Sequence, residues 1–339
     1  PVLGAATLAS VRSDVGAAAT RDLALVDLDS DGDLDLLAAT ASGLEVRLGD
    51  GLGGSGAPQQ IAISDVQALV SADLSGDGRP EVLVALGSGE VRVFANDGAG
   101  TLSPAGVVAT GPSPSDLALA DLDGDGQLDL IVACAGDDSL RPFTGNGLTF
   151  SPTTPLATGS QPAALIAADL DRDGRIDLVV AERGADTLGL FRGSSSGFLP
   201  RQSLSVGAGP ADLALADFDG DGWRDLVVAN RDDDTLSLFL GGASGLSPQG
   251  ALALAGGPRR VLARDLDGDG DPELAVALEA SSQLALIPAG AAASFGTPLS
   301  APARAGGALA LGDLNGDGRP DAFVGGAAGS SLHLGDPGL

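Results

Sequence analysis

The sequence of 339 residues contains 46 acidic and 18 basic residues, and its formal net charge of −28 argues against nucleic-acid binding because such a surface repels phosphate groups. A single cysteine excludes a disulfide scaffold and a thiolate metal cluster, and any histidine-based catalysis would depend on His333 in a chain without tyrosine or lysine. The hydrophobic content of 44% is too high for a disordered acidic tail, yet no apolar stretch reaches the roughly 18 residues of a membrane span.

The first predicted element is a strand from Val2 to Val11. It follows Pro1, which we interpret as a processed or trimmed end because it is neither a methionine nor part of a charged-then-apolar leader. Seven acidic segments of one pattern come next, the first two 46 residues apart and the others 48 residues apart. Repeats of this length that fill a chain indicate a closed or stacked repeat architecture.

Each period has the same order of predicted elements. An alternating stretch, as in Asp116–Ala120, predicts a strand with one buried face that leads into the acidic loop. The apolar run of residues 129–133 then predicts a strand covered on both faces. A polar turn (Gly136–Asp138), a third strand of the type Thr187–Phe191, a Gly/Ser/Asn turn and a weaker fourth strand follow. No window has the period or the caps of a sustained helix.

Four antiparallel strands per unit of about 40–50 residues are typical of a propeller blade. The last period stops after its third strand, Ser331–Leu334. We therefore predict an all-β fold for residues 1–339 as a single domain: a seven-bladed β-propeller with four antiparallel strands per blade. The ring would be closed by the N-terminal strand, which joins the last blade as its outer strand and leaves no open edge.

The acidic loops, with the spacing D-x-D-x-D-G-x-x-D, are predicted metal sites. They span residues 27–35, 73–81, 121–129, 169–177, 217–225, 265–273 and 313–321. Oxygen donors at positions 1, 3, 5 and 9, with the backbone carbonyl of position 7, can surround one calcium ion, and the glycine at position 6 permits the sharp turn. Up to seven structural Ca²⁺ ions are expected, whereas Mg²⁺ prefers rigid octahedral sites that retain water.

The predicted ligands are named here by loop position. Position 1 is Asp27, Asp73, Asp121, Asp169, Asp217, Asp265 and Asp313. Position 3 is Asp29, Ser75, Asp123, Asp171, Asp219, Asp267 and Asn315. Position 5 is Asp31, Asp77, Asp125, Asp173, Asp221, Asp269 and Asp317. Position 7 is Asp33, Arg79, Gln127, Arg175, Trp223, Asp271 and Arg319. Position 9 is Asp35, Glu81, Asp129, Asp177, Asp225, Glu273 and Asp321.

Two other interpretations of the loops fit this pattern less well. An EF-hand requires a glutamate at position 12, where this chain has only Ala38, Val84, Val132, Val180, Val228, Val276 and Val324. A plain Asp-Gly hairpin turn needs only one or two of these residues, not a fixed set in seven copies. Because Ser75 replaces a carboxylate, the second loop is expected to bind its ion most weakly.

These loops resemble those of the FG-GAP/VCBS repeat family, the calcium-binding blades of integrin α-subunit propellers and of many secreted bacterial proteins. The stretch from Gly111 to Phe150 is the most similar, and the resemblance extends over essentially the whole chain. It implies that the acidic loops lie on one face of the ring and that partners dock on the opposite face. That face would include the links 111–114, 137–138, 207–210, 232–234 and 256–260.

The resemblance also implies a function. We expect a calcium-stabilised extracellular module that binds a protein or a glycan, as in adhesion, or alternatively a structural subunit that docks in a larger cell-surface or envelope complex. The setting would be extracellular, at the cell surface or periplasmic, with membrane association only through a partner. A polysaccharide-active enzyme ranks last, and we expect no catalytic residues and no enzyme activity.

Several motifs have a structural interpretation. The G-x-S-x-G of residues 193–197 and the G-x-G-x-x-G of residues 49–54 both fall on the turn between third and fourth strands, so we expect hairpins rather than a nucleophile elbow or a dinucleotide site. Cys134 is expected in the core and His333 at the surface or in a strand ladder.

Two further groups are expected to make local contacts. Trp223 is expected to stack on a neighbouring loop, the alternative being an exposed ring that contacts a sugar or a protein. Arg259, Arg260 and Arg264 are expected to form local salt bridges, the alternative being a site for an acidic ligand.

Overall fold

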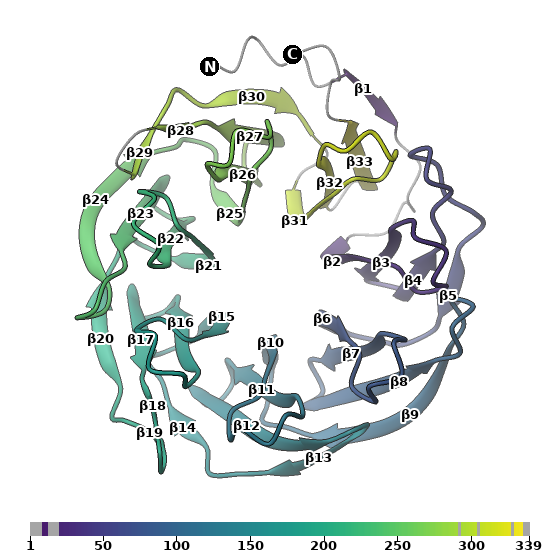
Figure 1. Ribbon diagram of the computed structural model, residues 1–339, viewed down its shortest axis with the longest axis horizontal. Coiled ribbons are helices and arrows are strands. Elements are labelled where there is room, and N and C mark those ends of the chain that lie inside the picture. The colour runs from purple at the N-terminus through teal and green to yellow at the C-terminus, as the bar shows by residue number, and fades with distance from the viewer. Residues whose placement is uncertain (1–8, 13–19, 291–292, 304–305, 327–328, 335–339) are drawn as a thin grey trace.

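A computed structural model describes residues 9–12, 20–290, 293–303, 306–326 and 329–334. These residues form strands and turns and no helix, arranged as seven antiparallel sheets around a central axis (Figure 1). The predicted all-β, seven-bladed propeller with four strands per blade is confirmed. Within these residues there is also no helix long and apolar enough to cross a membrane.

From the axis outwards, the strands follow the order of the chain in six blades; in the seventh, the inner three do so and the outer strand comes from the N-terminal part of the chain. The innermost strands are β2 (Thr20–Val26), β6 (Val66–Ala72), β10 (Pro114–Ala120), β15 (Pro162–Ala168), β21 (Pro210–Ala216), β25 (Pro258–Arg264) and β31 (Gly306–Gly312). The second strands are β3 (Asp35–Thr40), β7 (Glu81–Leu86), β11 (Asp129–Cys134), β16 (Asp177–Glu182), β22 (Asp225–Asn230), β26 (Glu273–Leu278) and β32 (Asp321–Gly326). The third strands are β4 (Gly43–Arg47), β8 (Glu90–Asn96), β12 (Ser139–Asn146), β17 (Thr187–Phe191), β23 (Thr235–Leu240), β27 (Gln283–Ile287) and β33 (Gly329–Leu334).

The outer strands are more varied. They are β5 (Gln59–Ile61), β9 (Leu102–Ala109), β13 (Thr149–Pro152) with β14 (Leu156–Ala157), β20 (Gln202–Ser205), β24 (Ser247–Ala253), β30 (Leu299–Pro302) and β1 (Ala9–Arg12). Two short hairpins extend the turns before the outer strands: β18 (Gly193–Ser194) with β19 (Gly197–Phe198), and β28 (Ala289–Gly290) with β29 (Ser294–Phe295).

The core lies between neighbouring blades. All six residues of each second strand are buried, as their continuous apolar runs predict, whereas the outer strand β24 is almost entirely exposed. One core cluster joins Leu37 and Val46 of the first blade to Val82 and Val84 of the second. The sheets therefore stack face to face around the ring.

The first and last blades also pack together. Leu23 and Leu36 of the first blade share a buried cluster with Phe323 and Leu332 of the seventh. The short strand β1 pairs antiparallel with β33, with Ala9 opposite Leu334. The seventh sheet therefore combines one N-terminal strand with three C-terminal strands; residues 2–8 of the predicted N-terminal strand lie outside the described residues.

Charged side chains occupy equivalent positions of four inner strands near the axis: Asp22, Asp116, Asp212 and Arg260. Each aspartate accepts a hydrogen bond from a backbone N–H of the next blade, at 2.9, 2.7 and 2.8 Å from the amides of Leu69, Leu165 and Val261. Arg260 donates to Asp22 at 3.0 Å and to Asp212 at 3.5 Å. Burial raises the pKa of Asp116 to about 7; Arg260 opposes this shift, and the carboxylates of Asp22 and Asp212 add to it.

This cluster predicts a pH dependence of stability. Between about pH 4 and pH 7 the folded chain keeps a proton on Asp116 that the unfolded chain releases, so the free energy of unfolding falls as the pH rises through this window. In Asp116→Asn the side chain stays neutral. We expect the free energy of unfolding of the variant, relative to that of the parent, to rise by about 1–3 kcal/mol as the pH goes from 5 to 8. Urea denaturation at saturating calcium measures this difference.

The control for this experiment is Asp97→Asn. Hydrogen bonds from the backbone N–H groups of Ala99 and Thr101 lower the pKa of Asp97, so its charge is constant between pH 5 and pH 8. The difference in free energy of unfolding between Asp97→Asn and the parent should not change with pH. A parallel pH profile of the parent and Asp116→Asn would contradict the buried, protonated carboxyl.

Candidate metal centres

The seven acidic loops join the inner strand of each blade to its second strand, so they lie at one end of the ring of inner strands. Position 9 is the first residue of the second strand in every blade. The glycine at position 6 has a positive φ, for example 95° at Gly32, which a side chain would disfavour. Its N–H donates to the position 1 carboxylate at 2.7–3.1 Å in all seven loops.

The position 5 carboxylate has a second role in the turn. In every loop its Oδ1 accepts the backbone N–H of position 7, at 2.8–3.0 Å. This local bond and the bonds to position 1 join the two sides of the turn. The aspartates therefore shape the turn as well as carry charge.

The position 9 carboxylate is buried and links three parts of its blade. In the fifth blade, Asp225 is 0% exposed; its Oδ2 accepts the N–H of Phe218 at 2.7 Å and its Oδ1 the N–H of Gly241 at 2.8 Å. The bond to the position 2 amide is present in all seven loops, at 2.6–3.2 Å. Burial raises the pKa of Asp225, the two backbone N–H groups oppose the shift, and the charges of Asp219 and Asp217 add to it.

The sequence analysis did not identify the glycine in the turn between the third and fourth strands, whose N–H donates the second hydrogen bond to the position 9 carboxylate. A side chain there would clash, since a Cβ on Gly241 would lie 2.2 Å from the carbonyl oxygen of Arg224. A signal was present, because a glycine follows position 9 by 16 residues in three consecutive blades: Gly145, Gly193 and Gly241.

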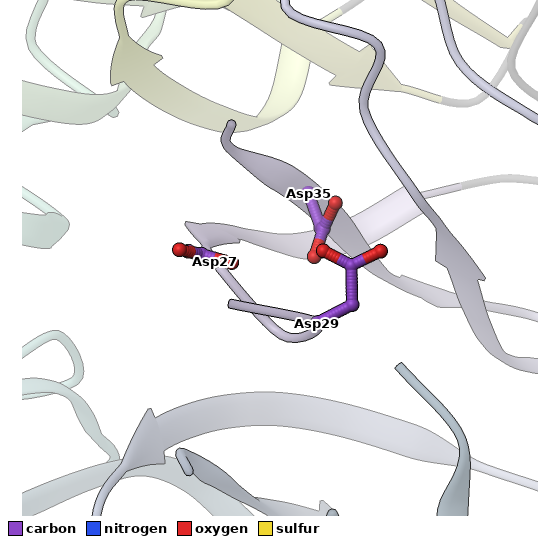
Figure 2. A group of neighbouring side chains, drawn as sticks. All are labelled: Asp27, Asp29 and Asp35. Atoms are coloured by element: carbon purple, nitrogen blue, oxygen red, sulfur yellow. The ribbon is translucent and has the colours of Figure 1, made fainter. Parts of the chain in front are cut away.

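The loops bring carboxylates together in groups of three. In the first, third, fourth and fifth loops, oxygens of positions 1, 3 and 9 lie within 4.8 Å of one another; in the sixth loop positions 1, 3 and 5 do so. Figure 2 shows the first group, in which the carboxylates of Asp29 and Asp35 face each other and Asp27 lies across the loop. Position 5 thus belongs to one group only, and no such group forms among the described residues of the loops with Ser75 and Asn315.

The donor sets fit a hard divalent cation. Oδ1 of Asp29 and Oδ1 of Asp171, both at position 3, are buried and have no hydrogen-bond partner among the described residues. A buried carboxylate oxygen without a partner is costly, and a cation bound by the group would pair with it. Desolvation raises the pKa of Asp29, and the charges of Asp31 and Asp27 add to this shift. Whether the position 7 carbonyls are ligands stays a prediction.

Arg192 is a neighbour of the fourth group that sequence reasoning missed. Its Nη1 donates to Oδ2 of Asp171 at 2.7 Å, while Nη2 donates to the carbonyl of Ser244 in the next blade at 2.9 Å. Arg192 lies 21 residues after Asp171, and no other blade has an arginine at the equivalent position. It therefore neutralises part of the charge of this loop only.

The remaining sequence motifs have the expected structural roles. Residues 193–198 form a hairpin, and residues 49–55 a turn closed by one bridge, with no helix in either segment. Cys134 is buried in the core. His333 lies in the ladder of β33 and is buried rather than at the surface, with Nε2 3.1 Å from the hydroxyl of Ser331.

Trp223 makes the expected contact, and the arginine group does so in part. The guanidinium of Arg172, in the loop of the preceding blade, lies 4.4 Å from the centre of the Trp223 ring. Arg259 pairs with Glu279 and Arg260 with two axial aspartates, as predicted, whereas Arg264 donates to the backbone carbonyl of Leu311.

Comparison with protein families gives one match. The sequence profile described as FG-GAP-like repeat matches five overlapping stretches, residues 27–84, 73–132, 121–180, 169–228 and 217–276. These stretches begin at position 1 of successive acidic loops. None of the curated proteins compared with the chain matches it.

Solved structures with a similar fold include binding proteins. BBS1N, solved in complex with ARL6DN, superimposes with a TM-score of 0.71 at 16% identity and covers 95% of this chain and 94% of its own. An Agrocybe aegerita lectin that recognises non-reducing terminal N-acetylglucosamine has a TM-score of 0.59 at 19% identity, with coverage of 91% and 87%. A Lactobacillus plantarum protein has a TM-score of 0.64 at 18% identity, with 84% coverage of both chains. At these identities the likeness concerns the fold.

Proposed function

Because the chain belongs to the FG-GAP-like repeat family, we propose that it is a calcium-stabilised, non-catalytic propeller that binds a protein or a glycan partner. The observation that carries the calcium part is the recurrence of three grouped carboxylates in five loops, from positions 1, 3 and 9 in four of them and from positions 1, 3 and 5 in the sixth, with a buried unpaired oxygen in two of the five. Residues at positions 1, 3 and 9 would hold the ion, and the ion would offset the repulsion between their charges.

The proposed setting is outside the cytosol. Extracellular calcium modules bind their ion at about 0.1–1 mM, so cytosolic calcium would leave comparable loops empty. The loops are formed from residues close in sequence and are half-buried or exposed at positions 1, 3 and 5, which favours weak, rapidly exchanging sites of this class. We therefore propose an extracellular, cell-surface or periplasmic location.

The binding role is supported by the fold neighbours, one solved with a protein partner and one a lectin. A docking subunit of a larger assembly is the second candidate, and the neighbour solved with ARL6DN favours it because it matches this chain over nearly the full length of both. Adhesion to a glycan and docking to a protein would both use the same stable ring, and they differ in which kind of partner binds to its surface.

A binding experiment tests this proposal. The labelled chain is applied to a glycan array and to a protein fraction of the cell envelope, each in 1 mM calcium (about the upper end of the extracellular range) and in excess chelator. We expect saturable binding in calcium that is lost in chelator, to glycans for the first candidate and to a protein for the second. Absence of binding to both, by a chain shown to be folded and calcium-loaded, would contradict the binding role.

A further inference from the structure

A polar cavity of about 620 Å³ opens around the axis, at the end of the ring opposite the acidic loops. Its lining comes from the starts of the inner strands, such as Pro114 and Ala163, and from the links between second and third strands, such as Ala135. Each inner strand has seven residues and therefore separates the cavity from the loops by about 20 Å. The volume is that of a small-molecule site.

Arginines gather around this cavity although the chain as a whole is strongly acidic. Five of them line it: Arg21, Arg183, Arg231, Arg259 and Arg260. They come from the first, fourth, fifth and sixth blades, so only the closed ring brings them together. Asp65 also lines the cavity and pairs with Arg21 at 3.4 Å, and Arg260 pairs with Asp22 and Asp212, so the arginines left to meet a ligand are Arg183, Arg231 and Arg259 at the rim.

The positive charges at the rim exceed their local partners. Arg231 and Arg259 share Glu279, at 2.8 and 3.4 Å. The guanidinium of Arg183 makes no hydrogen bond among the described residues, and the carboxylate nearest to it is that of Asp232. Oδ2 of Asp232 lies 3.8 Å from Arg183, and Oδ1 lies 3.6 Å from Arg231. Three guanidinium groups therefore share two carboxylates.

Mutual repulsion accompanies this shortage of carboxylates. Burial lowers the pKa of Arg259, Glu279 opposes the shift, and the charges of Arg260, Arg231 and Arg183 lower it further. An oxyanion placed among these groups would accept their unused N–H donors in the planar, two-pronged geometry that arginine favours.

We propose that this cavity binds a small organic anion with two acidic groups, held by Arg183, Arg231 and Arg259. The lining contains no aromatic side chain, so a neutral sugar would find no stacking surface there. The negative field of the whole chain opposes the approach of a long polyanion more than that of a small one. This inference rests on the proposed binding function: it names the face of the propeller that binds and the chemical class of the ligand.

The test is calorimetric titration at fixed free calcium with three probes: digalacturonate, its uncharged counterpart galactobiose, and malonate. We expect digalacturonate to bind with a Kd below about 1 mM, and Arg183→Ala and Arg231→Ala each to raise that Kd by about tenfold or more. Arg231→Lys, which keeps the charge and loses the two-pronged geometry, should fall between the parent and Arg231→Ala. Galactobiose should not bind.

The matched control is Arg92→Ala, which removes an arginine of the second blade that pairs with Glu90 away from the cavity. Its Kd should equal that of the parent. Malonate binding with the same arginine dependence would identify a free dicarboxylate as sufficient; binding of digalacturonate alone would identify an acidic saccharide. No binding of either acid, equal binding of galactobiose, or an equal loss in Arg92→Ala would overturn the proposal.

The same samples separate this proposal from the calcium hypothesis. The single tryptophan, Trp223, lies in the fifth acidic loop, so its fluorescence can follow calcium binding there while calorimetry follows the anion at the opposite end. Calcium binding without anion binding would overturn the cavity proposal alone. Anion binding by a chain that takes up no calcium would overturn the calcium hypothesis alone.

Discussion

Removal of calcium is expected to lower the melting temperature of the chain by roughly 10 °C. A ligand that binds only the folded state stabilises it by RT ln(1 + [L]/Kd), about 1.4 kcal/mol per site when the ion is at ten times its Kd. Five loops form groups of three carboxylates, which together would contribute about 7 kcal/mol. In a chain of this size each kcal/mol shifts the melting temperature by roughly 1–2 °C.

The measurement is a thermal melt followed by circular dichroism, in 1 mM calcium (about ten times the lower extracellular Kd) and in excess chelator, with metal analysis to show that the ions are removed. Magnesium at the same concentration should restore less of the stability than calcium. Trp223 fluorescence should change on calcium addition in the parent and not in Asp217→Asn, whereas Asp265→Asn, the same substitution in the sixth loop, should keep the change. An unchanged melt after complete removal of the ions would contradict the structural role of calcium.

Substitution of a position 9 carboxylate is expected to destabilise the chain even without calcium. Asp225→Ala removes the acceptor of two backbone N–H groups, those of Phe218 and Gly241, in a place that is fully buried. Each buried donor left without a partner costs about 1–3 kcal/mol, so we expect a loss of about 2–5 kcal/mol in the free energy of unfolding. Urea denaturation in excess chelator measures this loss without any contribution from the ion.

The comparison variant is Asp221→Ala, at position 5 of the same loop. Asp221 is exposed and, within the described part of the chain, accepts only the N–H of Trp223, which water can replace. In chelator we expect its effect to stay within about 0.5 kcal/mol. Equal losses in the two variants would show that the position 9 carboxylate does not brace the calcium-free blade.

The sequence was sufficient to predict the parts of the structure that depend on local order. The spacing of the seven loops specified the blade count, and the apolar runs after each loop identified the buried second strands. The loop turns follow from Asp and Gly at fixed offsets, because their hydrogen bonds join residues at most seven apart, such as Asp225 and Phe218.

Contacts between distant blades could not be predicted in the same way. Arg260 and Asp22 are 238 residues apart and meet only because both lie on inner strands of a closed ring. Four of the cavity arginines fall on two repeat positions: Arg183 and Arg231 lie one repeat of 48 residues apart, and Arg21 and Arg259 each lie six residues before the first aspartate of their loops. The other blades have other residues at these positions, so the repeat reveals the cluster only once the ring order is known. Arg259 and Arg260 form a positive pair in the sequence, but their neighbours are determined by the closed ring and not by the order of the chain.

The buried cluster between the first and seventh blades has a consequence for synthesis. Leu23 and Leu36 emerge from the ribosome about 290–310 residues before their partners Phe323 and Leu332 (323 − 36 = 287 and 332 − 23 = 309). At about 5–20 residues per second, the apolar face of the first blade stays uncovered for roughly 15 to 60 s. During that interval the nascent chain carries an exposed apolar surface, so folding conditions that hold back aggregation matter most before the last blade is complete.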